Sequence, residues 1–146
     1  MCQVGEVCRY SRQMPLVLRE LPGELAILQL PSDATTPSWL SFAATPLVSV
    51  THAADELSVV CPSSEVPAGI SCEAGWRAFR VEGKQDFSAV GILSSILSPL
   101  ANAGISIFSI STFDTDYILV RAGVVEKARS VLRQHFELLE PQGKTA

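Results

Sequence analysis

The carboxyl-terminal half of the chain has the more readable hydrophobic pattern. Residues 77–82 alternate between polar and apolar positions, which predicts a half-buried strand. Apolar residues then recur at helical spacing as far as Asn102, and Asp86 or Ser88 can cap the helix that this spacing predicts. The apolar stripe of that helix consists of Val90, Leu93, Leu97 and Leu100.

The rest of this half alternates strands and helices. Residues 105–111 and 117–120 are rich in β-forming residues and flank an acidic turn, which predicts a hairpin. A second helix follows with an apolar stripe opposite a charged face, and residues 137–140 can form a last strand. The order β-α-β-β-α-β is typical of the ferredoxin-like fold, with two helices on one face of a four-stranded antiparallel sheet. The second stripe consists of Val125, Ala128, Leu132 and Phe136.

The amino-terminal half contains a partial repeat of this pattern. Residues 49–60 align with residues 109–120 at a constant offset of 60, and both segments consist of a strand, an acidic turn and a strand. The connection before residue 49 is short and rich in proline, so it leaves space for one short helix at residues 38–42. We expect an α+β protein of two ferredoxin-like units, the first degenerate, with an extension over 1–15, units over 16–70 and 71–140, and a tail over 141–146.

Composition and charge narrow the possible functions. Of the 146 residues, 47% are hydrophobic, which is enough to form a core and excludes disorder. The 11 basic side chains are outnumbered by 15 acidic ones, so no basic field is available for nucleic acid or an anionic membrane. The uncharged segment 87–113 carries many hydroxyl groups together with Pro99 and Gly104, which is unlike a membrane span.

The cysteine and charged residues indicate no catalytic chemistry. The spacing of the four cysteines matches neither a redox pair nor a zinc site, so we expect free thiols and no metal. The first dozen residues show no apolar core of the length that a secretory signal requires, so we expect a cytoplasmic protein. Asp114 and Asp116 lie two residues apart on a predicted turn, where such residues usually cap their own backbone. No phosphate-binding loop or catalytic motif occurs, so we expect neither an enzyme nor a cofactor.

A binding site is better supported at the start of the first predicted helix. The segment Ser88–Gly91 would present backbone N–H groups at the positive end of the helix dipole, which suits a carboxylate. Gly91 would allow either close approach of a ligand or close packing of another helix. If Asp116 lies nearby, an acceptor and a set of donors would be spaced for an α-amino acid.

The segment DFSAVGILSSILSPLANAGISIFSISTFDTDYILV, residues 86–120, resembles the core of an ACT domain. Gly91-Ile92-Leu93 stands in the place of the family's Gly-Val-Leu. The string ISTFDTDYILV is similar to the tandem-ACT branch that includes the regulatory regions of aspartate kinases and the CASTOR arginine sensors. The resemblance covers residues 76–136 well and residues 25–67 faintly.

The resemblance implies a sensor that binds a small molecule, usually an amino acid, between two ACT units, and that has no catalytic activity. It also implies a homodimer whose interface includes the small residues Gly91, Ser95 and Ser98 of the uncharged helix, and a downstream protein target that the sequence does not identify. The alternative is a structural or protein-interaction module that keeps the fold without a ligand. Carried over by position, the ligand-lining residues are Asp86, Phe87, Ser88, Ala89, Val90, Gly91, Ile92, Leu93, Thr112, Phe113 and Asp116, with Ser58 and Val59 on the opposite wall.

Overall fold

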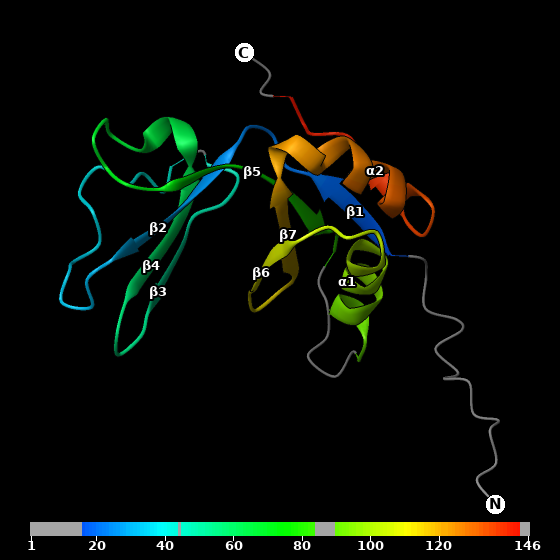
Figure 1. The fold of residues 1–146 in the computed structure, drawn as a ribbon, viewed down its shortest axis with the longest axis horizontal. Coiled ribbons are helices and arrows are strands. Elements are labelled where there is room, and N and C mark those ends of the chain that lie inside the picture. Colours follow the sequence, from blue (N-terminus) through cyan, green and yellow to red (C-terminus); the bar gives the residue numbers. More distant parts are fainter. Residues whose placement is uncertain (1–15, 44, 84–89, 144–146) are drawn as a thin grey trace, which may run out of the picture.

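The computed structural model describes residues 16–43, 45–83 and 90–143 of the chain. Within these residues the chain forms strands, two α-helices and two 3-10 helices (Figure 1). The strands are β1 (Val17–Glu20), β2 (Leu25–Leu30), β3 (Ser49–His52), β4 (Leu57–Pro62), β5 (Glu73–Val81), β6 (Ile107–Ser111), β7 (Asp116–Arg121) and β8 (Glu137–Leu139). The helices are α1 (Ile92–Asn102) and α2 (Val125–Arg133), with the 3-10 helices η1 (Ser63–Glu65) and η2 (Ala122–Val124).

The strand β5 joins the two halves of the molecule. Along one edge it pairs antiparallel with β7, from Trp76 opposite Arg121 to Arg80 opposite Tyr117, and β6 pairs with β7. Along the other edge it pairs antiparallel with β2 near its start and with β1 near its end. Because β5 is nine residues long, it pairs with strands of both halves and joins them in one sheet.

The predicted α+β class is confirmed, since the sheet is mostly antiparallel and the order β5-α1-β6-β7-α2-β8 matches the expectation. The prediction of a four-stranded antiparallel sheet in this half is wrong. The strand β1 lies between β5 and β8, antiparallel to β5 and parallel to β8. The hydrophobic pattern shows little sign of β1, because a strand of four residues that includes Arg19 and Glu20 has almost no alternation of hydrophobic and polar positions.

The two helices cover one face of β5 and its neighbours. Phe79 and Val81 are fully buried on this face, together with Leu18 of β1 and Ile118 and Val120 of β7. From the helices, the buried side chains are those of Ile96, Leu100, Val125, Ala128 and Leu132. The stripe predicted for the second helix is therefore confirmed, with Phe136 packed at its margin.

The prediction for the first helix needs a correction at its start. The helix begins at Ile92 and not near Ser88, and Val90 lies before it with 66% of its surface exposed. Gly91 is the reason, because its φ of 81° is left-handed and ends any helix that would extend toward the amino terminus. The deepest contact of α1 with the core is therefore made by Ile96 and Leu100.

A buried carboxylate attaches β1 to the helix layer. Glu20 is 1% exposed and accepts a hydrogen bond from Arg77 Nη2 at 2.6 Å. It also accepts hydrogen bonds from Arg129 Nε and Nη2 of α2, at 2.7 and 2.8 Å. The hydrogen bonds to Glu20 raise the pKa of the Arg129 guanidinium above its usual value. Because a buried charge is tolerated only when it is paired, this cluster holds β1, β5 and α2 together.

The amino-terminal half adds β2, β4 and β3 in that order beyond the start of β5 (Figure 1). The predicted hairpin of β3 and β4 is confirmed, with Ser49 opposite Val60. Loops cover the outer face of these strands, and Leu40 and Trp39 are inserted among the buried Val59 and Cys61.

The predicted helix at residues 38–42 is wrong. This segment contains only a turn, in which the Leu40 N–H donates to the Pro37 carbonyl at 3.1 Å. Trp39 and Leu40 instead both pack into the apolar cluster against β4, so tertiary packing, and not local helix formation, decides the conformation of this segment.

A second apolar cluster fills the space between the two halves. It contains Trp76 and Leu119 from the carboxyl-terminal half and Leu25, Leu47 and Val60 from the amino-terminal half. In Figure 1, β2, β3 and β4 lie on the side of β6 and β7 opposite to the helices. The sheet of the carboxyl-terminal half is therefore covered on one face by its own helices and on the other by a separate part of the chain.

Candidate functional site

The turn between β6 and β7 is fixed to the end of β5. The Thr112 N–H donates to the Thr115 carbonyl at 2.8 Å, and the Thr115 N–H donates to Thr112 Oγ1 at 3.3 Å. The buried Thr115 hydroxyl donates to the Val81 carbonyl at 2.6 Å. The amino end of α1 lies at the same end of the sheet as this turn (Figure 1).

Asp116 has both a fixed position and remaining capacity to bind. Its Oδ1 accepts a hydrogen bond from Ser111 Oγ at 2.5 Å across the hairpin. Its Oδ2 accepts no hydrogen bond from the residues that the structure describes. A carboxylate oxygen in this state can accept a donor from a ligand.

The amino end of α1 presents backbone donors. The Ser95 N–H donates to the Gly91 carbonyl at 2.9 Å and is the first donor of the helix. The N–H groups of Ile92, Leu93 and Ser94 therefore have no carbonyl within the helix to bond. Such a helix end favours an anion, although the preceding residues needed to complete a site lie outside the described part of the chain.

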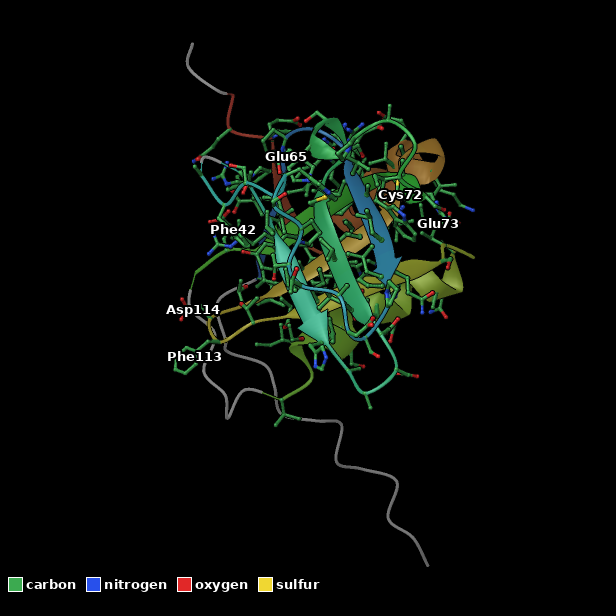
Figure 2. All side chains as sticks on the ribbon, turned by 90° about the vertical axis from the view of Figure 1, so that its left-hand side faces the viewer. Phe42, Glu65, Cys72, Glu73, Phe113 and Asp114 are labelled. Carbon is green, nitrogen blue, oxygen red and sulfur yellow. The ribbon has the colours of Figure 1, made fainter. Side chains whose placement is uncertain are left out.

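The structure separates the predicted site residues into several groups. Asp86, Phe87, Ser88 and Ala89 lie outside the described residues. The side chains of Ile92 and Leu93 are half-buried and pack against the core beneath the helices. Phe113 is 78% exposed and points outward beside Asp114 at the edge of the molecule (Figure 2).

Of the two residues predicted for the opposite wall of the ligand site, Ser58 and Val59, only Ser58 faces a cavity. Val59 is fully buried in the cluster beneath the loops, and its side chain points away from the other half. Ser58 lies on the opposite face of β4 and lines a cavity of about 210 Å³ between the two halves. The walls of this cavity, which we call the seam cavity, come from β3, β4 and β6: Ser49, Thr51, Ser58, Val60, Phe108, Ser109, Ile110 and Ser111.

Hydroxyl groups are the main polar side chains of the seam cavity, and sequence analysis did not single out most of them. Ser49 and Thr51 of β3 are the counterparts of Ser109 and Ser111 of β6 at the offset of 60 residues. The repeat was therefore the signal that could have identified them, since equivalent positions of both copies face one cavity. Ser111 also connects the cavity wall to Asp116.

The described residues show no metal centre and no membrane helix. No group of three or more His, Cys, Asp or Glu side chains is arranged there to hold a metal ion. Neither of the α-helices in the described ranges has the length and apolar character needed to cross a bilayer. Cys61 and Cys72 are both free, and burial, the largest cause, raises the pKa of the Cys61 thiol to about 11.

The comparisons with known proteins agree with this architecture. A family model described as ACT domain matches residues 71–134, and a second, described as an N-terminal domain, matches residues 23–69. No curated protein matches the chain. A solved structure from Agobacterium tumefaciens is 33% identical, with a TM-score of 0.81, and the alignment covers 92% of this chain and 99% of that one.

Two more distant structures show the same fold. A Vibrio cholerae protein described as of unknown function and a possible transport protein is 17% identical, with a TM-score of 0.64, covering 83% of this chain and 90% of that one. The aspartate kinase of Clostridium acetobutylicum, described as an allosteric enzyme, is 12% identical, with a TM-score of 0.60, covering 82% of this chain and 34% of that one. The chain contains an ACT domain over residues 71–134, as its sequence predicted.

Proposed function

We propose that this protein is a regulatory module that binds a small molecule, most simply an amino acid, and has no catalytic activity of its own. In this proposal the amino-terminal half is a degenerate ACT unit that has kept its strands and replaced its helices by loops. The alternative is an interaction module that has kept the fold without a ligand. A cytoplasmic location belongs to the same proposal, because Cys61 and Cys72 form no disulfide.

The seam cavity is the observation that carries this proposal. Its hydroxyl-bearing walls come from corresponding strands of the two halves, and Ser111 connects it to Asp116 at 2.5 Å. The cavity, at about 210 Å³, is below the range of roughly 300–1,000 Å³ that is usual for drug-sized ligands, which favours a smaller compound. Asp116 Oδ2 would accept a hydrogen bond from the ammonium group of an amino acid.

The amino end of α1 would bind the other end of the same ligand. Its N–H groups suit a carboxylate. Apart from its chain neighbours, no atom of the described residues lies within 4 Å of the position that a Cβ on Gly91 would take. The full set proposed to line the ligand is the one carried over from the family, of which Val59 lies with its side chain in the core and can contribute only its backbone.

The small-residue surface of α1 supports a proposed homodimer. Gly91, Ser95 and Ser98 are all exposed, and α1 contains no charged residue. A helix face of this kind permits close approach of a second helix. Sedimentation at micromolar concentration should therefore show a dimer, and a monomer alone would contradict this part of the proposal.

A thermal-shift screen against the twenty amino acids tests the proposed ligand class. A compound at 100 times its dissociation constant should stabilise the protein by roughly 2.7 kcal/mol, which corresponds to several degrees. Asp116→Ala should abolish the shift and leave the melting temperature of the free protein nearly unchanged. Glu56→Gln is a matched control, because Glu56 stands at the equivalent turn position of the first half, where it accepts a hydrogen bond from Gln29. No shift with any amino acid would favour the interaction module.

A further inference from the structure

A second cavity lies on the face of the carboxyl-terminal sheet that its helices do not cover. Its volume is about 470 Å³, within the range of roughly 300–1,000 Å³ of small-molecule sites. Arg19, Arg80 and Tyr117 line it from the sheet, and Pro22 and Pro46 line it from the loops of the amino-terminal half. It shares no residue with the seam cavity. We call it the arginine cavity.

Arg80 is the feature of this cavity that the fold does not explain. Its Nε is buried and has no hydrogen-bond partner, and its guanidinium carbon lies 6.0 Å from the centre of the Tyr117 ring. In the described part of the chain Arg80 donates to no carboxylate. A buried N–H donor is normally satisfied, so the unpartnered Nε–H of Arg80 indicates an acceptor supplied from outside the described structure.

The other arginines in the described ranges behave differently. Each of them donates to a glutamate, at distances between 2.6 and 3.0 Å: Arg19 to Glu82, Arg77 and Arg129 to Glu20, Arg121 to Glu73, and Arg133 to Glu140. Arg77 also has a buried Nε without a partner, but its Nη2 is bound to Glu20. Arg80 is therefore distinguished by having no counter-charge within the described structure.

Within the described lining, the charges of the arginine cavity leave one positive charge without a partner. Arg19 and Glu82 neutralise each other through their ion pair at 2.7 Å, which leaves the charge of Arg80. A guanidinium matches a planar carboxylate with two parallel hydrogen bonds. Leu21 and the two prolines give the same cavity an apolar wall. We propose that the arginine cavity binds a small organic monocarboxylate, with its carboxylate on Arg80 and its apolar part against Leu21, Pro22 and Pro46.

This site goes beyond the proposed amino-acid site and is independent of it. The arginine cavity contains no residue of the α1 amino end and no part of the β6 wall. Its occupant needs no ammonium group, because the one carboxylate in its described lining, that of Glu82, is already paired with Arg19. A carboxylic acid without an amino group can therefore distinguish the two sites.

Calorimetry and thermal shift with 3-phenylpropanoate test the proposal, with the neutral 3-phenylpropanamide and inorganic phosphate as comparison compounds. The carboxylate should raise the melting temperature of the wild-type protein by several degrees at millimolar concentration, and the amide should not. Arg80→Gln should remove this shift. Lys127→Gln, which removes the same charge at an exposed position of α2, should keep it, and so should Asp116→Ala. In an NMR titration, the Arg80 Nε–H resonance should move with 3-phenylpropanoate.

Each contrary result has a definite meaning. No shift with 3-phenylpropanoate, or an equal shift in Arg80→Gln, would overturn the site. An equal shift with the amide would show an apolar pocket in which Arg80 has no part. A larger shift with phosphate that depends on Arg80 would overturn the monocarboxylate assignment. Loss of the shift in Asp116→Ala would show that the probe occupies the proposed amino-acid site instead.

Discussion

Both faces of β5 carry an arginine beside buried apolar side chains, but the two arginines differ in whether they have a carboxylate partner. On the helix-covered face, Arg77 lies beside Phe79 and donates to the buried Glu20. On the opposite face, Arg80 lies two residues beyond the buried Ala78, with no carboxylate partner in the described structure and a cavity in front of it. On the first face the arginine charge is balanced by a buried glutamate. On the second face the arginine has no carboxylate partner in the described structure and lines a cavity.

The origin of the cover explains this difference. The helices α1 and α2 come from the chain segments that directly follow β5 and β7, so they pack closely over the strands that precede them. The opposite face is covered by strands and loops of the amino-terminal half. These contact it through the second apolar cluster, which contains Trp76 and Leu119, and leave the seam cavity and the arginine cavity at its margins. A margin of this kind is where ligand sites commonly form.

The largest effect is expected from the charge cluster on the helix face. Glu20→Gln keeps the shape of the side chain but leaves Arg77 and Arg129 without their shared counter-charge, so the free energy of unfolding should fall by about 3–5 kcal/mol. Urea denaturation measures this loss. In Glu73→Gln the exposed partner of Arg121 is lost, and the cost should be about 0–1 kcal/mol. If both variants lost the same unfolding free energy, burial of the Glu20 carboxylate would not explain the loss.

A pH-dependent effect is expected from Cys61 beneath the loops. Burial raises its pKa from 9.0 to about 11, so the folded state holds the thiol proton more tightly than the unfolded state. The resulting stability is complete below pH 9 and is lost as the pH rises toward 11, by about 2–3 kcal/mol. Because other groups titrate in this range, urea denaturation of the wild type is compared with that of Cys61→Ala. Parallel pH profiles would contradict the assignment.

A smaller effect is expected at the start of α1. Gly91→Ala places a Cβ on a residue with a φ of 81°, which should cost about 1 kcal/mol of unfolding free energy. The cost comes from the backbone conformation, because the described residues beyond its chain neighbours have no atom within 4 Å of that Cβ. Gly123→Ala is the control, because Gly123 has equally open surroundings without a left-handed φ. Thermal denaturation should show a loss for the first variant only. If both variants were equally stable, the left-handed conformation of Gly91 would not account for a stability cost.

The smallest effect is expected on the open face of β5. Arg80→Gln should change the unfolding free energy by less than about 0.5 kcal/mol, because it leaves no carboxylate unpaired. Arg77→Gln should cost about 2 kcal/mol, since it removes a charged hydrogen bond to Glu20. The pair is compared by urea denaturation without ligand. A loss as large for Arg80 as for Arg77 would mean that Arg80 has a structural partner.

Much of the fold was predictable because it depends on local periodicity. The α2 stripe and both hairpins follow from patterns within about a dozen residues, and the ACT resemblance of residues 86–120 gave the family. The start of α1 was misplaced, because the left-handed conformation of Gly91 leaves no mark in hydrophobic spacing. The candidate site was predictable only in part: Ser58 and Asp116 were named, whereas Ser49 and Thr51 were not.

The sequence by itself determined the class of fold, the hairpin pattern repeated at an offset of 60 residues, and the excess of acidic over basic residues. Only the tertiary structure placed β1 between β5 and β8, brought β3 opposite β6, and left Arg80 without a counter-charge in the described structure. These features depend on contacts between residues far apart in the chain. Such contacts have no local period, and they are decided by which edges and faces remain to be covered once the local elements have formed.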